Sequence, residues 1–201
     1  MAINMRRSTR RAISIAAVIV LALAGYFTYK YFGASAAQVP AGFADARAKG
    51  GAISEDIVRL SEELKGDIAR ANDLDKQRKF KEAGEVTAAA GVKVGDIRAR
   101  ALELVSELER MTGALPQIRN ADARAAATDS IANRLELIKH LITYTEKVTD
   151  FLVALEEHFG GAKNEQVIEQ LLYDINLEVE AINEFNRKAA EAMQRFDDLL
   201  K

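Results

Sequence analysis

The residues best suited to chemistry in this chain are its two histidines, His140 and His158. Glu136 lies one helical turn before His140 and Tyr144 lies one turn after it, so a helix would place all three on one face. A carboxylate beside an imidazole can orient a general base or help to bind a metal ion. Because no second ligand is visible, we favour the simpler interpretation of His140 as a residue at the edge of the core.

No other pattern in the sequence indicates catalysis or metal binding. Cysteine is absent, which excludes disulfides, thiolate metal sites and a cysteine nucleophile. Leucines stand three residues before each histidine, so the Glu-x-x-His motif of two-metal helical bundles is missing. HExxH, GxSxG and glycine-rich phosphate loops are missing as well. His158 suits the C-terminal end of a helix, where a cation is favourable. We therefore predict no catalytic, cofactor-binding or metal-binding residues.

Two further clusters have a structural and a functional interpretation. Lys76, Arg78, Lys79 and Lys81 could contact lipid headgroups or an acidic partner, although such runs are usually solvated helix faces. Gly84, Gly91 and Gly95 share one side of a helix. They indicate either a hinge or groove for a closely packed helix, or a locally weak or broken helix.

The elements that carry these residues follow an apolar segment near the N-terminus. Residues 12–29 are uncharged, residues 1–11 contain four arginines and no acid, and five aromatic residues fall within 26–32. A run of about 20 apolar residues spans a bilayer, aromatic rings favour its interface, and flanking arginines favour the cytoplasmic side. We predict a cytoplasmic basic N-terminus at 1–11 and a transmembrane signal anchor at 12–32.

Two alternatives remain for this segment. A cleaved signal peptide would end near Ala34-Ser35-Ala36, and a buried core helix would need no membrane. The length of the run and its bulky aromatic end favour a retained anchor. Beyond it lie 23 basic and all 30 acidic residues, a formal balance of −7 that argues against nucleic-acid binding.

Residues 33–53 are predicted to form a flexible linker because small residues, a proline and paired glycines dominate them. Ser54 then resembles an N-cap, and apolar residues at helical spacing predict a helix over about 54–72. Asn72, Asp73 and Asp75 are expected to separate it from the next helix.

Three long amphipathic helices are predicted after that point. A heptad pattern runs from about 76 to 114 without a slip. Its members are Phe80, Ala83, Thr87, Ala90, Val94, Ile97, Ala101, Leu104, Leu108, Met111 and Leu115. A wide apolar face that includes Leu135 predicts a helix over about 118–158. Asn164 caps the last helix, in which residues from Ile168 to Leu199 are expected to face inward.

These patterns predict an all-α fold: an N-terminal transmembrane helix followed by an elongated antiparallel bundle of three to four helices over 54–201. We expect a structural or protein-interaction module on the extracytoplasmic side of the plasma (inner) membrane. Its partners would be the membrane, through residues 12–32, and other envelope proteins or a second copy, through the bundle. The alternative is a sensor or ligand-binding bundle that works with a partner protein, and an exported hydrolase is the least favoured class.

Overall fold

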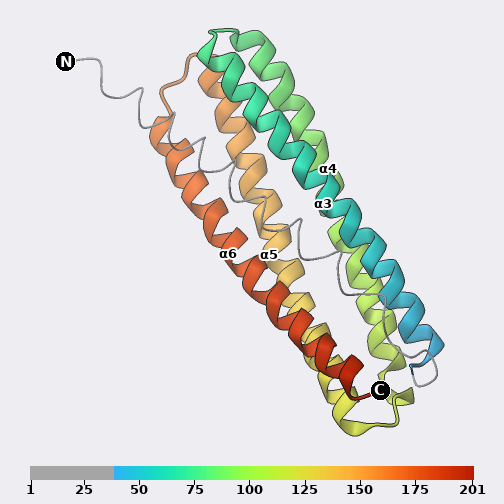
Figure 1. The fold of residues 1–201 in the computed structure, drawn as a ribbon. Helices are drawn as coiled ribbons and strands as arrows, with labels where there is room; N and C mark the ends of the chain where they lie inside the picture. Colours follow the sequence, from blue (N-terminus) through green and yellow to red (C-terminus); the bar gives the residue numbers. More distant parts are fainter. Residues whose placement is uncertain (1–38) are drawn as a thin grey trace.

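The structure, a computed structural model, describes residues 39–201 and is helical in that range. The helices are α3 (Ala41–Lys76), α4 (Phe80–Ala114), α5 (Ala121–Phe159) and α6 (Glu165–Asp198), with a short 3₁₀ turn, η1 (Leu115–Gln117), between α4 and α5. They run up and down in chain order and form an elongated antiparallel bundle (Figure 1). The predicted helical bundle is confirmed. The predicted segments 1–11 and 12–32 lie outside the described residues.

One continuous core runs along the bundle and follows the heptad spacing. In α4 every predicted position from Ala83 to Met111 is buried, and in α6 the buried residues run from Ile168 to Phe196. Three predicted core positions instead lie on the surface: Phe80 is 46%, Leu135 45% and Leu199 41% exposed. Phe80 and Leu199 lie at helix ends, and Leu135 lies at the margin of its apolar face, so neighbouring helices do not cover them.

Part of the predicted linker is helical, which corrects its extent. Residues 41–53 form the first part of α3, and the Pro40 carbonyl accepts hydrogen bonds from the amides of Phe43 and Ala44. Phe43 and Ala46 are fully buried, because this segment docks on the rest of the bundle. Ser54 is therefore inside the helix, where its hydroxyl donates to the Gly50 carbonyl at 2.8 Å. Tertiary packing overrides the weak local helix propensity here.

The turn between α3 and α4 also differs from the prediction. It lies at residues 77–79, and the expected break at Asn72–Asp75 is helical. Arg78 takes a left-handed backbone conformation, with φ of 62°, and the Lys79 amide donates to the Leu74 carbonyl. The basic cluster thus surrounds a turn. Its lysines lie beside acids, as Lys76 does with Asp73 at 2.8 Å.

Helix α4 is continuous through Gly84, Gly91 and Gly95. A Cβ atom added at Gly84, Gly91 or Gly95 would meet nothing within 4 Å, so no described element packs closely on that side. The glycines therefore mark neither a break nor an occupied helix groove within residues 39–201.

The remaining turns are fastened by asparagines. The Asn120 side chain accepts from the amides of Asp122 and Ala123, which caps α5, and donates to the Leu199 carbonyl at 3.2 Å. At the opposite end of the bundle α5 ends at Phe159, and Gly161 in the following turn has a φ of +100°. Asn164 precedes α6 but uses its amide to donate to the Ala154 carbonyl at 2.8 Å.

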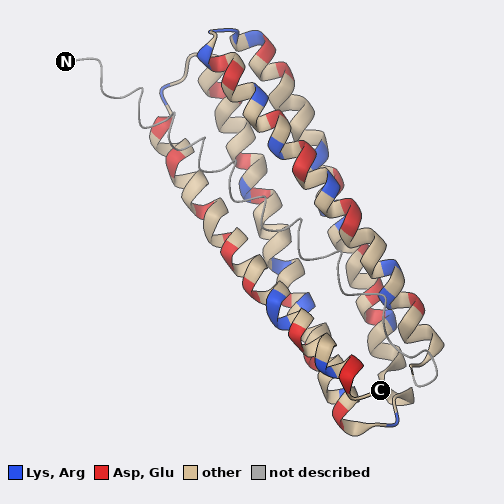
Figure 2. Ribbon diagram, viewed as in Figure 1, with Lys and Arg blue, Asp and Glu red and all other residues tan. Residues whose placement is uncertain are grey.

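The four helices do not pack equally closely on all sides of the bundle. Broad backbone approaches join α3 to α4, α4 to α5 and α5 to α6, whereas α3 and α6 approach each other mainly through side chains. Two of those contacts lie at one end: the rings of Phe43 and Phe196, with centroids 5.1 Å apart, and the ion pair of Arg47 with Asp197. Basic and acidic side chains are mixed along α3, α4 and α5, whereas α6 carries only acidic charges from Glu165 to Glu184 and has its first basic residue at Arg187 (Figure 2).

Candidate functional site

The structure pairs His140 with a different carboxylate from the one that the sequence suggested. Its Nδ1 lies 2.7 Å from Oε2 of Glu178 on α6, while Glu136 forms an ion pair with Lys139 at 3.1 Å. The imidazole stacks on Phe185, with centroids 5.4 Å apart. The pair is about three-quarters buried and joins α5 to α6, which matches the edge-of-core interpretation.

Tyr144 lies one turn further along α5, inside the core. Only 3% of its surface is exposed, and burial raises the pKa of its phenol to about 12. Glu136, His140 and Tyr144 therefore have three separate environments, although they share one side of α5. His158 lies in the last turn of α5, with its ring edge toward Phe159. Within residues 39–201 no group of three His, Asp or Glu side chains could bind a metal ion.

A groove lies between α3, α4 and α5 and is made of two adjoining hollows, the second of which also reaches Ile182 of α6. Both are bounded by Ser54, Leu104 and Leu137, and apolar side chains supply most of their walls. Their volumes are about 30 and 20 Å³. Such spaces hold one or two water molecules, far below the several hundred Å³ of a typical small-molecule site.

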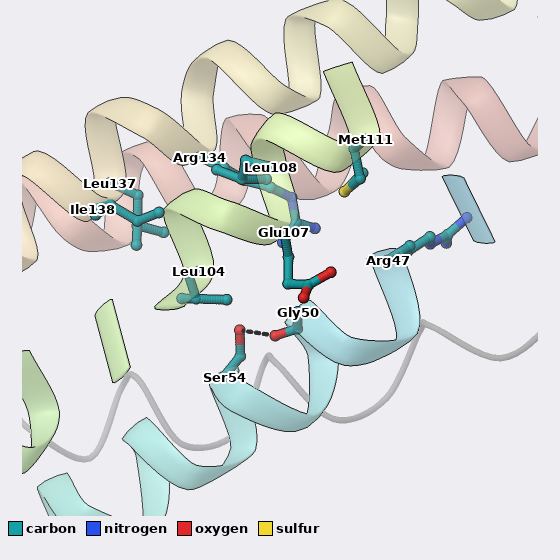
Figure 3. A pocket seen from close by; sticks show the side chains of 10 residues that line it. All are labelled: Arg47, Gly50, Ser54, Leu104, Glu107, Leu108, Met111, Arg134, Leu137 and Ile138. Atoms are coloured by element: carbon teal, nitrogen blue, oxygen red, sulfur yellow. Dashed lines mark hydrogen bonds between the residues drawn. The ribbon is translucent and has the colours of Figure 1, made fainter. Parts of the chain in front are cut away.

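Charged side chains gather at one end of this groove. Arg47 comes from α3, Glu107 from α4 and Arg134 from α5, around Met111 and Leu108 (Figure 3). Arg47 donates two hydrogen bonds to the Asp197 carboxylate, at 2.6 and 2.8 Å, and both side chains are about nine-tenths buried. Glu107 pairs with Arg110 at 2.5 Å.

Arg134 is a partly buried cation beside the groove. Burial lowers the pKa of its guanidinium to about 10, so the side chain stays charged at neutral pH. Its Nε lies 3.5 Å from the hydroxyl of Ser130, which itself donates to the Ala189 carbonyl on α6. Charged groups from three helices thus meet a narrow apolar groove, an arrangement that fixes how those helices pack and leaves room for water-sized occupants.

Sequence reasoning did not single out Arg47, Glu107, Arg134 or Asp197. One signal was present, because Arg134 lies three residues after Ile131 and four before Ile138, both in the core. A charged residue at that spacing marks a buried or half-buried cation. The partners on other helices carry no such signal, since each lies far away in the sequence.

None of the described helices combines the length and the apolar character that crossing a membrane requires. Comparisons of the chain with protein-family models, with curated proteins and with solved structures find no match.

Proposed function

We propose that this protein is anchored in the plasma (inner) membrane by residues 12–32 and displays its bundle outside the cytoplasm as a structural or protein-interaction module. The observation that carries the proposal is the position of the rod. Its first helix begins at Ala41, eight residues beyond the apolar segment, and α4 alone is about 52 Å long. Such a rod spaces or recruits other proteins at a defined height above a bilayer.

The surface of the bundle supports this role. Charges of both signs lie along α3, α4, α5 and the last part of α6, and many form ion pairs one turn apart, such as Arg187 with Glu184 at 3.0 Å and Glu191 at 2.8 Å. The groove between α3, α4 and α5 is narrow, and Arg47 and Glu107 at its end are engaged in ion pairs. The proposal accordingly assigns no enzymatic step to the described residues.

The runner-up function is a sensor or ligand-binding bundle that acts with a partner protein. The specific observation in its favour is the desolvated Arg134 beside the groove. A ligand larger than water would have to part α3 from α4 and α5, so binding would change the bundle itself.

The topology can be tested directly because the chain has no cysteine. Ser8→Cys places a thiol before the apolar segment, and Ser106→Cys places one on the exposed face of α4. A membrane-impermeant maleimide added to intact cells should label the Ser106→Cys protein and should reach the Ser8→Cys protein only after lysis. Both proteins should stay with the membranes during alkaline carbonate extraction. Labelling in the reverse order, or a soluble protein cleaved near residue 36, would refute the anchored topology.

The interaction role needs a separate experiment. Crosslinking in native membranes, followed by purification, should recover the same envelope protein repeatedly with the full chain. That protein should be absent with a variant that keeps residues 1–53 and lacks the bundle. A preparation that yields only this chain would point to self-association, and a small molecule that copurifies with the bundle would favour the sensor.

A further inference from the structure

We infer that residues 41–53 form a strap that can release from the bundle as a unit while the rest of α3 stays docked. The strap is the part of α3 that closes the bundle against α6. Release frees residues 41–53 from their packing on α4 and from their contacts with α6, and three glycines weaken the helix of this segment on its own.

The docked state depends on a small number of side chains. Phe43 and Ala46 are fully buried, and the Phe43 ring packs against Phe196 of α6. Arg47 and Asp197 form a two-pronged ion pair at 2.6 and 2.8 Å. Asp45 pairs with Arg110 at the exposed edge. Helices α3 and α6 have no broad backbone approach, so the side-chain contacts of Phe43 and Arg47 provide much of the closure at this end of the bundle.

The local sequence works against helix formation in the strap. It contains Gly42, Gly50 and Gly51, and glycine is the poorest helix former after proline. No side chain caps its N-terminus, and no acidic residue lies in its first turn. Helix α5 begins with an asparagine cap and an aspartate, which the strap lacks. The strap is therefore helical chiefly because it is docked.

The boundary of the releasing unit follows from packing. Beyond residue 53, Ile57, Leu60 and Leu64 bury α3 against the core over several turns. The strap ends before that anchored part, and Gly50 and Gly51 lie in its last turn, where glycine tolerates backbone conformations outside the helix.

Release has two consequences. It uncovers Phe196 and the wall of the groove near Leu104 and Met111, which the strap helps to cover. It also lengthens the connection between the bundle and residue 32, from residues 33–40 to residues 33–53. At about 3.5 Å per extended residue, the maximal reach grows from about 28 Å to about 73 Å. The change in reach above a membrane rests on the proposed function, whereas the release itself does not.

The structure offers a specific way to lock the strap. A Cβ atom built at Gly50 lies 3.9 Å from Cβ of Glu107, a separation typical of disulfides. Because the chain has no cysteine, Gly50→Cys with Glu107→Cys introduces a single reversible crosslink. Asp197→Asn weakens the docked state, and Asp198→Asn is the matched control, since that neighbour is 54% exposed.

Hydrogen exchange of the full chain in phospholipid vesicles, read by mass spectrometry, tests the proposal. Amides 45–53 should exchange together, about tenfold or more faster than amides 57–64. Oxidation of the double-cysteine variant should remove that difference, and reduction should restore it. Asp197→Asn should speed exchange of 45–53 by about tenfold and leave α4 unchanged, while Asp198→Asn should behave like the wild type.

Two results would contradict the proposal that the strap releases as a unit. One is exchange that falls off residue by residue from Ala41, which is ordinary fraying. The other is exchange of 45–53 at the rate of the whole bundle, with no response to Asp197→Asn. If the double-cysteine variant fails to fold, the comparison of Asp197→Asn with Asp198→Asn still tests whether the strap releases as a unit. The strap and the anchor are tested separately. If the exchange pattern shows release but alkaline carbonate extracts the protein from membranes, the strap proposal stands and the membrane anchor is rejected.

Discussion

Tyr144 shows how a single buried group makes stability depend on pH. Its phenol is neutral in the folded protein up to about pH 12, whereas an unfolded chain ionises it near pH 10. The raised pKa means that folding is fully favoured below pH 10 and loses stability as the pH rises from 10 to 12. Tyr144→Phe should remove this loss, about 2–3 kcal/mol in the free energy of unfolding, measured by urea titration across that range.

The same pair of proteins supplies its own control. Below pH 9 the phenol is neutral in both states, so the difference in unfolding free energy between wild type and Tyr144→Phe should not vary with pH. Parallel curves from pH 9 to 12 would mean that Tyr144 ionises as freely in the bundle as in the unfolded chain.

At the residue scale, the sequence predicted the position of His140 and missed its partner. Glu136 was the visible carboxylate because it lies four residues away, within one helix. Glu178 lies on α6, and its approach to His140 depends on the register between two helices. A single sequence does not encode that register in any local pattern. The pairing of Arg47 with Asp197 also depends on the register between two helices, so the sequence alone does not predict it.

At the scale of elements, two exposed glycines of α4, Gly91 and Gly95, are positions at which the stability can be raised. Gly91 and Gly95 have helical backbones, and an added Cβ would meet nothing within 4 Å. Alanine at each should stabilise the bundle by about 1 kcal/mol, because glycine gains more backbone freedom on unfolding. The melting temperature should rise by about 2–4 °C per substitution.

The opposite effect is expected at Gly161, where substitution by alanine should destabilise the protein. The φ of +100° at this residue is a conformation that side chains with a Cβ rarely adopt, so Gly161→Ala should lower stability by about 1–2 kcal/mol. Circular dichroism melts of the three variants check both signs. A loss of stability in Gly91→Ala or Gly95→Ala would indicate that a partner packs on that face.

The elements also show where sequence reasoning succeeds and where it stops. The ends of α5 and the span of α6 were predicted within a few residues because long apolar patterns at helical spacing mark them. Residues 41–53 were predicted as a linker because their composition is that of one. Phe43 is the only aromatic residue there, and its burial against Phe196 depends on a helix more than 150 residues away.

At the scale of the whole molecule, the two ends of the rod differ. One end carries the start of α3, the turn at 115–120 and the C-terminus, which Asn120 and Leu199 tie together (Figure 1). The other end carries the turns at 77–79 and 160–164. In the proposed topology the first end faces the lipid.

That orientation can be measured with single dye labels. Gln117→Cys and Gln77→Cys place exposed thiols at the two ends, about 52 Å apart along α4. In vesicles that contain headgroup-linked quenchers, a dye at position 117 should be quenched, and a dye at position 77 should not. Equal quenching would show that the rod lies along the membrane or does not attach to it.

The order in which the helices pack has a consequence for how the chain folds. The broad interfaces join helices that follow one another in the chain, so most contacts close short loops. Bundles of this kind fold within microseconds to milliseconds. Each hairpin can form as soon as its second helix emerges during synthesis or transport. The contacts of α6, with α5 and with α3, must wait for the last helix, and those of Phe43 and Arg47 join it to the segment that lies farthest from it in the described chain.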